Sequence, residues 1–443
     1  MHLIRLLPRE VIHTTLSYLM QSDLIALAET CKAWYTLVMG WPGLWREIDV
    51  TTSDHHDACR RFLQQAPAQY VRTLRYHLGD DEDHMTQHIF DMIGDLKWNW
   101  LEELMIRCSE AGEPYSAKAI IYNCRKSLKR LHLISDLVGE ELNYCLEMCP
   151  NLEHVIYEED YYTIDLYHDE DEDELDPLSP GPYQLRQLTI LCDATDLNIA
   201  DLISRCPHLE SFHFYCRHPN YKDQLSHIIP ALLEHCPNLH TVEISSKERS
   251  MFIKDQISWI PAKAHNDIGC GGLLHKLIMH ADLTTHAMDG LRKLIGRSKT
   301  SLEKLDVGNM QSGTMLFQAL ITAQLINLRE LSCTFAGDQT AIAQLKAQIE
   351  LSPRLERVFI PHFGISDAVL SSLEQLCNLI ELRFCVDSPV TYNGLASLLS
   401  QSPSLQDIDL HHNYQRSHLS MYDIIRALAA CRSLQKLRLS SNA

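Results

Sequence analysis

Two stretches, Leu101-Glu102-Glu103-Leu104-Met105-Ile106 and Leu128-Lys129-Arg130-Leu131-His132-Leu133, decide how this chain folds. In both, an apolar residue is followed by two variable residues, a second apolar residue, one variable residue and a third apolar residue. Repetition at a constant period indicates that one small unit is stacked many times. Twelve further units follow the same pattern more or less closely, about 28 residues apart on average, and begin at Val71, Leu152, Leu185, Leu209, Leu239, Leu274, Leu302, Leu328, Leu355, Leu379, Leu405 and Leu434.

A helical pattern precedes the strand pattern in these units. Upstream of Ser402-Pro403, for example, Leu395, Leu398 and Leu399 recur at helical spacing. Proline then ends the helix, and the residue before it leaves helical backbone angles. Each unit therefore joins a helix to a short strand. The same junction occurs at Cys149-Pro150, Cys206-Pro207, Cys236-Pro237 and Ser352-Pro353, and we expect its three cysteines to be buried as small apolar side chains.

These units resemble leucine-rich repeats of the longer, cysteine-containing subclass. The resemblance implies an α/β solenoid shaped like a horseshoe, with a parallel sheet on the concave face and helices on the convex face. A single unit cannot fold alone, because its three apolar anchors each contribute about 1.5–3 kcal/mol when buried, whereas ordering each residue costs about 1.5 kcal/mol. The stability must therefore come from stacking.

Two intervals between units are longer than the rest, and we predict insertions there, at residues 158–182 and 245–272. The stretch from Glu158 to Asp176 contains 11 acidic residues and neither lysine nor arginine. A block of like charge at this density is typical of a disordered, solvated loop. The alternative is a docking arm for a basic partner. The second insertion has mixed charge and contains Trp259, so we expect part of it to pack.

The first fifty residues lack the repeat and have the spacing of short helices. The order of their residues closely resembles the F-box over residues 5–50: Leu7-Pro8-x-Glu10-Val11, Leu16-x-Tyr18-Leu19, Asp23-Leu24, Leu27-Ala28, Cys31-Lys32-x-Trp34-Tyr35 and Leu44-Trp45. The resemblance implies an all-α F-box domain of three helices. We therefore predict an F-box domain at 1–50, a linker or capping helix at 51–70 and about fourteen repeats at 71–443.

F-boxes joined to leucine-rich repeats form a family of substrate receptors of Skp–cullin–F-box ubiquitin ligases, and the layout of this chain is similar. The resemblance implies a non-catalytic substrate-recognition subunit. Its F-box would bind a Skp-type adaptor, and through it a cullin and a RING protein, while its repeats would bind a protein substrate for ubiquitination. The alternative is a leucine-rich-repeat interaction scaffold or inhibitor whose F-box-like segment only caps the solenoid.

The F-box resemblance also supplies candidate adaptor-binding residues, although helix packing asks for the same apolar side chains. We favour Leu7 and Pro8 as contacts because they precede the first helix, and we expect Trp34 and Trp45 to be core residues. The full set is Leu7, Pro8, Ile12, Leu16, Leu19, Leu24, Leu27, Cys31 and Trp34.

Candidate substrate-binding residues flank the second apolar anchor of each unit. In a strand, side chains alternate between the two faces, so these residues point away from the core and onto the concave sheet. Phe359, with Arg357 and Arg383 nearby in the predicted sheet, is the strongest candidate, because aromatic and arginine side chains dominate protein interfaces. The full set is Arg130, His132, His154, His213, Lys304, Arg357, Phe359 and Arg383.

Composition excludes several classes of function. The chain has 39 Lys and Arg against 58 Asp and Glu, a net charge of −19, which disfavours binding to nucleic acid phosphates. No apolar run approaches the roughly 20 residues of a membrane span. Fifteen cysteines without a Cys-x-x-Cys pair fit a reducing compartment, so we expect a cytoplasmic or nuclear protein. The sequence has no recognisable nucleotide, metal or nucleophile motif, and we predict no cofactor.

Overall fold

The structure is a computed structural model, and it describes residues 8–49, 62–76, 92–108, 115–135, 140–159, 181–192, 198–216, 221–246, 274–281, 283–308, 313–333, 339–360, 365–386, 390–413 and 417–442. The chain divides into two compact units, Met1–Cys192 (unit 1) and Asp193–Ala443 (unit 2). Most of the two predicted insertions, at 158–182 and 245–272, lies outside the described residues, and so does Leu7.

The described part of unit 1 begins with the helices α2 (Arg9–Leu16), α3 (Gln21–Thr30), α4 (Lys32–Met39) and the short α5 (Pro42–Arg46). The first three are the helices that the sequence predicts. Proline occupies the first position of α5, where its missing N–H and restricted φ angle suit a helix start. Their small core is formed by Ile12, Leu16, Leu24, Ala28, Val38, Leu44 and Trp45.

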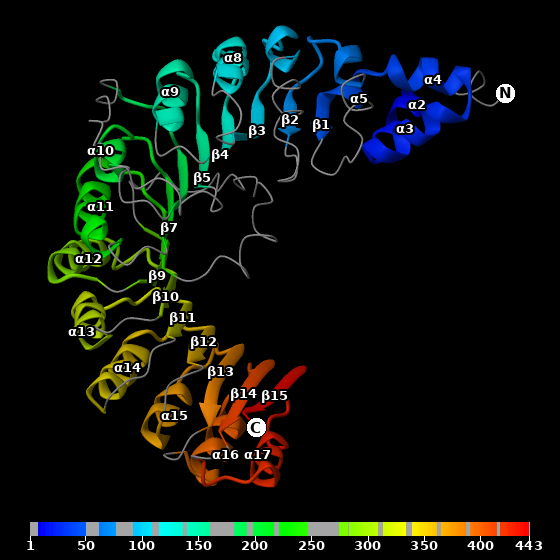
Figure 1. Cartoon of the computed structure of the whole chain (residues 1–443). Helices are drawn as coiled ribbons and strands as arrows, with labels where there is room; N and C mark the ends of the chain where they lie inside the picture. Colours follow the sequence, from blue (N-terminus) through cyan, green and yellow to red (C-terminus); the bar gives the residue numbers. More distant parts are fainter. Residues whose placement is uncertain are drawn as a thin grey trace. The chain divides into compact units, whose positions relative to one another are not determined.

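The rest of unit 1 is a parallel sheet whose strands follow one another in chain order (Figure 1). The strands are β1 (Glu47–Asp49), β2 (Thr73–Tyr76), β3 (Glu103–Cys108), β4 (Arg130–Ser135), β5 (His154–Glu159) and β6 (Gln187–Cys192), with helices α8 (Tyr115–Cys124) and α9 (Glu140–Met148) between them. Strand β1 lies before the first predicted repeat, inside residues 1–50, and pairs with β2. The sheet therefore starts directly after α5.

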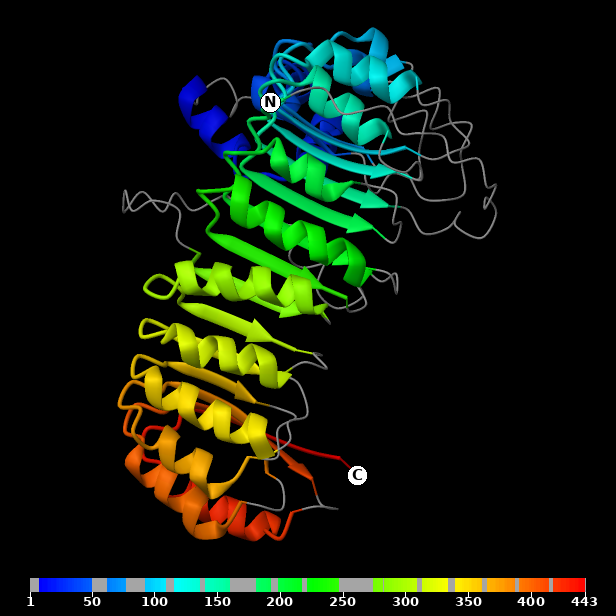
Figure 2. The same cartoon turned by 90° about the vertical axis from the view of Figure 1, so that its left-hand side faces the viewer.

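Unit 2 repeats the same arrangement, and Figures 1 and 2 show its helices side by side on one face of the sheet. In each unit, we call the face of the sheet opposite its helices the inner face. The strands are β7 (Ser211–Cys216), β8 (Thr241–Ser245), β9 (Lys276–His280), β10 (Lys304–Val307), β11 (Glu330–Cys333), β12 (Arg357–Ile360), β13 (Glu381–Val386), β14 (Asp407–Asn413) and β15 (Lys436–Asn442). The helices are α10 (Ile199–Ser204), α11 (Tyr221–His235), α12 (Thr285–Arg297), α13 (Gly313–Ala323), α14 (Gln339–Leu351), α15 (Asp367–Leu373), α16 (Tyr392–Gln401) and α17 (Met421–Leu428).

The strand register explains why the leucine pattern produces a sheet. The second apolar anchor of each repeat pairs with the second anchor of the next repeat. These anchors therefore form one continuous buried row in unit 1 and another in unit 2. In unit 1 the row is Ile48, Leu74, Leu104, Leu131, Val155 and Leu188, and in unit 2 it runs from Phe212 through Val242, Leu277, Leu305, Leu331, Val358 and Leu382 to Ile408. The predicted leucine-rich-repeat solenoid is confirmed in both units.

The cysteines before the prolines are buried, as the repeat pattern predicts. Burial raises the pKa of Cys149 and of Cys236 to about 12, so both thiols stay protonated at neutral pH. The Cys236 Sγ lies 3.6 Å from the carbonyl oxygen of Cys206, the equivalent residue one repeat earlier. This position therefore holds a small side chain that packs between neighbouring repeats.

Candidate interaction surfaces

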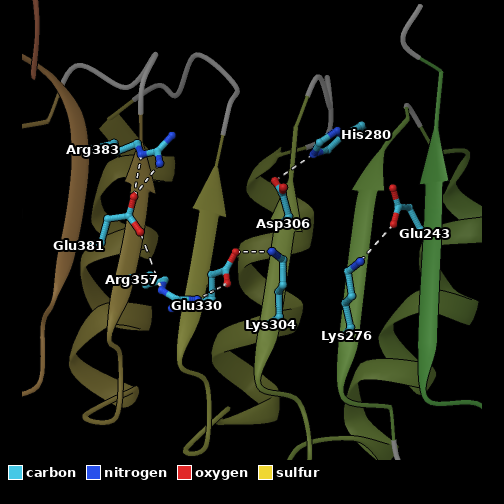
Figure 3. Close-up of polar contacts among 9 residues, drawn as sticks. All are labelled: Glu243, Lys276, His280, Lys304, Asp306, Glu330, Arg357, Glu381 and Arg383. Atoms are coloured by element: carbon cyan, nitrogen blue, oxygen red, sulfur yellow. Dashed lines mark hydrogen bonds and ion pairs between the residues drawn. The ribbon is translucent and has the colours of Figure 1, made fainter. Parts of the chain in front are cut away.

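Three predicted substrate-binding residues, Arg357, Phe359 and Arg383, come together on the inner face of unit 2. Figure 3 shows the two arginines of this group. Strands β12 and β13 are paired in a register that places Arg357 beside Glu381 and Phe359 beside Arg383. The Arg383 guanidinium lies over the Phe359 ring, 4.8 Å from its centroid, and its Nε and Nη2 donate to Glu381 Oε1 at 3.1 and 2.6 Å. We call Arg357, Phe359 and Arg383 the arginine–phenylalanine cluster.

The charges beside this cluster continue as a ladder across the sheet. Arg357 lies between two carboxylates, with its Nη1 3.6 Å from Glu330 Oε2 and its Nε 3.8 Å from Glu381 Oε2. Further along, the contacts are Lys304 with Glu330, His280 Nε2 with Asp306 Oδ1 at 2.9 Å, and Lys276 Nζ with Glu243 Oε2 at 3.3 Å (Figure 3). Such partly exposed pairs contribute only about 0–1 kcal/mol each to stability. The alternating signs instead favour selectivity for a partner with a matching pattern of charges.

His213 and Glu243 lie at the β7–β8 end of this ladder, and both side chains are largely buried. Burial lowers the pKa of His213, whose Nε2 lies 2.7 Å from the hydroxyl oxygen of Ser211. Burial alone would raise the pKa of Glu243, but the charges of Lys276 and His213 and a 2.7 Å hydrogen bond from the Tyr215 hydroxyl outweigh it, so this pKa is lowered. Both groups therefore resist protonation in the folded chain.

The lowered pKa of His213 makes unit 2 sensitive to acid. The unfolded chain takes up a proton near pH 6.5, whereas folded His213 does so only at lower pH, so stability falls as pH drops below that value. Glu243 adds a second loss below its ordinary pKa of 4.5. Between about pH 7.5 and pH 5.5 we therefore expect the melting temperature to fall.

Calorimetry of a His213→Gln variant measures this effect, because the substitution removes the titrating group. The variant should have a smaller slope between pH 7.5 and 5.5 than the unaltered chain. His286→Gln, at an exposed position on α12, should keep the full slope. Equal slopes in the two variants would contradict the assignment to His213.

The inner face of unit 1 carries three more predicted substrate-binding residues, and one of them, His132, differs from expectation. Arg130 Nη1 lies 3.2 Å from Glu103 Oε2, so this cation is already paired. His132 has only 2% of its side chain exposed and lies 3.4 Å from Glu158, so it is too enclosed to contact a partner directly. His154 is half-buried, with its Nδ1 3.2 Å from Gln187 Oε1. Glu158 lies on the neighbouring strand, and a strand-by-strand sequence pattern does not place it against His132.

The predicted adaptor-binding residues divide into buried and exposed groups. Ile12, Leu16 and Leu24 are buried and hold the helices together. Leu27 and Trp34 are half-buried, whereas Pro8, Leu19 and Cys31 are exposed. Sequence alone could not separate these groups, because packing and binding both select apolar residues.

Several exposed apolar side chains of these helices were missed. Tyr18 is 83% exposed and Met20 72% exposed, both in the turn between α2 and α3, and the others are Val11 on α2, Ile25 on α3 and Tyr35 on α4. An apolar residue outside the buried stripe of a helix is a sequence signal for an exposed apolar side chain. Val11 gives this signal, because it is apolar and does not belong to the stripe formed by Ile12 and Leu16. We call these five residues the exposed apolar set.

The helices are attached to the first strand by polar contacts. The Gln21 side-chain amide donates to the Glu47 carbonyl oxygen at 3.2 Å, and its Oε1 accepts from the backbone N–H of Asp49 at 3.3 Å. Trp45 is buried and its Nε1 donates to the Met39 carbonyl oxygen at 2.9 Å. The helices therefore continue directly into the repeat sheet.

Comparison with known proteins assigns the helical segment. Residues 4–51 match the F-box-like family. The chain is an F-box-like domain followed by a leucine-rich-repeat sheet. A solved structure that it resembles is the complex of Rad7 and Elc1 from yeast, with 14% sequence identity, 81% of this chain and 83% of that chain covered, and a TM-score of 0.36. No curated protein sequence matches the chain.

Two other kinds of site, for a metal ion and for a membrane span, are absent from the part of the chain that the structure describes. Within these residues, no three His, Cys, Asp or Glu side chains are placed to hold a metal ion. No helix among them is both long and apolar enough to cross a membrane. The interaction surfaces described above are the exposed apolar set of the F-box-like domain and the inner face of the repeats.

Proposed function

We propose that this chain is the substrate-recognition subunit of a Skp–cullin–F-box ubiquitin ligase. Its F-box-like domain would bind a Skp-type adaptor, and its repeats would bind the protein to be ubiquitinated. The observation that carries the proposal is the F-box-like match at residues 4–51, on helices that leave Leu19 and the five side chains of the exposed apolar set exposed. Such a subunit needs no catalytic group, because it acts by raising the local concentration of substrate near a conjugating enzyme.

The exposed apolar set supports the adaptor half of the proposal. Large exposed apolar side chains are enriched at protein interfaces, and aromatic and methionine side chains are prominent among them. Tyr18, Met20 and Tyr35 belong to those residue types. Their burial against an adaptor would supply the apolar centre of an interface, while Ile12 and Leu16 keep the helices folded beneath.

The arginine–phenylalanine cluster supports the substrate half. Glu381 and Glu330 hold Arg383 and Arg357 in place, so these side chains lose less conformational entropy when a partner binds. Phe359 supplies a half-exposed aromatic surface under Arg383. A preorganised aromatic–arginine pair is the kind of feature that dominates binding energy in protein interfaces.

Substrate capture by the repeats can be tested with a double substitution on the inner face. Phe359→Ala with Arg383→Gln should reduce the recovery of at least one captured protein about tenfold in affinity purification under proteasome blockade, because a central contact is lost. The matched control is Tyr392→Ala with Arg426→Gln, which removes a similar stacked pair (5.4 Å) at helices α16 and α17. An identical set of captured proteins in both variants would argue against the inner face as the substrate site.

An interaction scaffold or inhibitor is the second candidate function. The contacts of Gln21 with Glu47 and Asp49 favour it, because they are what a domain that only caps the first strand requires. Adaptor binding separates the two candidates: a receptor binds the purified Skp-type adaptor, whereas a scaffold with a capping domain does not.

A further inference from the structure

A cavity of about 470 Å³ in unit 1 lies at the amino-terminal edge of three strands. Helix α5, the turn before β2 and the first residues of β2, β3 and β4 form its walls. Because the strands are in register, Thr73, Glu103 and Arg130 form one row across the sheet. The volume is within the range of about 300–1,000 Å³ that is usual for ligand pockets. We call this cavity the amino-edge groove.

The lining of the amino-edge groove is positive although the chain is strongly negative. It contains four cationic side chains and two carboxylates, a local charge of +2, against −19 for the whole chain. Charges more than about 8 Å away are largely screened at physiological ionic strength. A partner in the groove therefore responds to the local cations. The charged residues are Arg46, Arg72, Lys129, Arg130, Glu102 and Glu103.

The two carboxylates leave Arg72 and Lys129 only loosely paired. Glu103 lies 3.2 Å from Arg130, and also 3.2 Å from Arg75, which reaches it from β2. Glu102 is shared between Arg72 at 3.5 Å and Lys129 at 3.8 Å, both longer than the roughly 2.7–2.9 Å of a charge-assisted hydrogen bond.

Arg46 has even less charge compensation than Arg72 and Lys129. It is exposed, and it forms no ion pair with any residue that the structure describes. Arg46, Arg72 and Lys129 therefore keep N–H donors for carboxylates from outside the chain.

Aromatic side chains lie next to these donors. Tyr70 lines the groove and is 37% exposed. Trp100 is 59% exposed, and the Arg72 guanidinium lies 5.5 Å from its ring centroid while donating to its carbonyl oxygen at 3.2 Å. The surface therefore offers aromatic contact area beside the cations, the combination that favours a protein ligand over a free anion.

We propose that the amino-edge groove is a docking site for an acidic peptide segment of a partner protein. Glu and Asp side chains of the peptide bind Arg46, Arg72 and Lys129, and an adjacent apolar side chain packs on Tyr70. The site includes none of the exposed apolar set and none of the arginine–phenylalanine cluster. It is therefore an additional recognition surface, and it does not depend on adaptor binding.

Fluorescence anisotropy with the full chain tests the proposal. The probe is a fluorescein-labelled peptide of about twelve residues in which Glu and Asp alternate with Gly, Ser and one Leu, and its neutral counterpart has Gln and Asn instead. We expect the acidic peptide to bind at least tenfold more tightly than the neutral one, with an affinity that falls as salt is added. Arg46→Gln with Lys129→Gln should weaken the acidic peptide at least tenfold.

The matched control removes two positive charges elsewhere. Lys293→Gln with Lys299→Gln, both exposed positions in unit 2, should leave peptide affinity unchanged. Equal affinity for the two peptides, or equal losses in the two variants, would overturn the proposal. Arg46 and Lys129 are exposed and do not pack in the core. The groove variant should therefore keep the melting temperature and the adaptor affinity of the unaltered chain. Unchanged values of both show that a loss of peptide binding comes from the docking site and not from unfolding or from a wrong adaptor assignment.

Discussion

Changing Tyr18 and Met20 together to aspartate is expected to weaken binding of a Skp-type adaptor by about 100-fold or more. Both side chains lie in the turn between α2 and α3 and are largely exposed, so neither contributes to the helix core. In an adaptor complex, however, the new carboxylates would be buried without a partner, which is strongly unfavourable. Calorimetric titration with purified adaptor measures the loss.

The control for this prediction makes the same chemical change in unit 2. Ile326→Asp with Tyr422→Asp replaces side chains that are 50% and 73% exposed, and it should leave adaptor affinity unchanged. If the Tyr18 and Met20 variant also bound the adaptor as tightly as the unaltered chain, the exposed apolar set would not be the adaptor surface. If the unaltered chain bound no adaptor at all, the scaffold function would be favoured.

Trp45→Ala should destabilise unit 1 by about 3–5 kcal/mol, the usual cost of removing a large buried aromatic side chain. The Trp45 side chain is 1% exposed, its ring centroid lies 4.7 Å from that of Phe62, and its Nε1 donates to the Met39 carbonyl oxygen. The substitution therefore leaves a cavity where α5 passes into β1, together with an unpaired carbonyl. Denaturant unfolding followed by circular dichroism measures the change in the free energy of unfolding.

Trp100→Ala is the matched control, because it removes the same side chain from an exposed position in the same unit. It loses only an exposed stacking contact with Arg72, and we expect a change of about 1 kcal/mol or less. Equal destabilisation by the two substitutions would contradict the view that Trp45 joins the helices to the sheet.

The repeat fold was predictable because its signal is local and is repeated many times. Leu104 and Leu131 occupy the same place in their units, and each unit adds the same evidence for a buried strand. Strand β1 was missed for the same reason: Glu47–Asp49 is three residues long and has a single buried anchor, Ile48, so it carries no repeat of its own. It forms a strand because β2 provides a partner.

The interaction surfaces were only partly predictable. Alternation along a strand places Phe359 and Arg383 on the inner face, and the structure has them stacked there. The same rule gave His132 as a surface residue, but Glu158 on the next strand lies against it and the side chain is buried. For the F-box-like helices, the pattern identified the apolar residues but could not divide buried Leu16 from exposed Tyr18.

The amino-acid sequence by itself determined the division of this chain into a short helical segment and a long series of repeats, because both depend on the spacing of apolar residues along the chain. Only the tertiary structure decided which charges are compensated and which side chains stay exposed. Arg130 and Glu103 are 27 residues apart, and their ion pair exists because consecutive strands are in register. Burial and charge pairing are properties of neighbours in space, and a residue's spatial neighbours are set by the stacking of whole repeats.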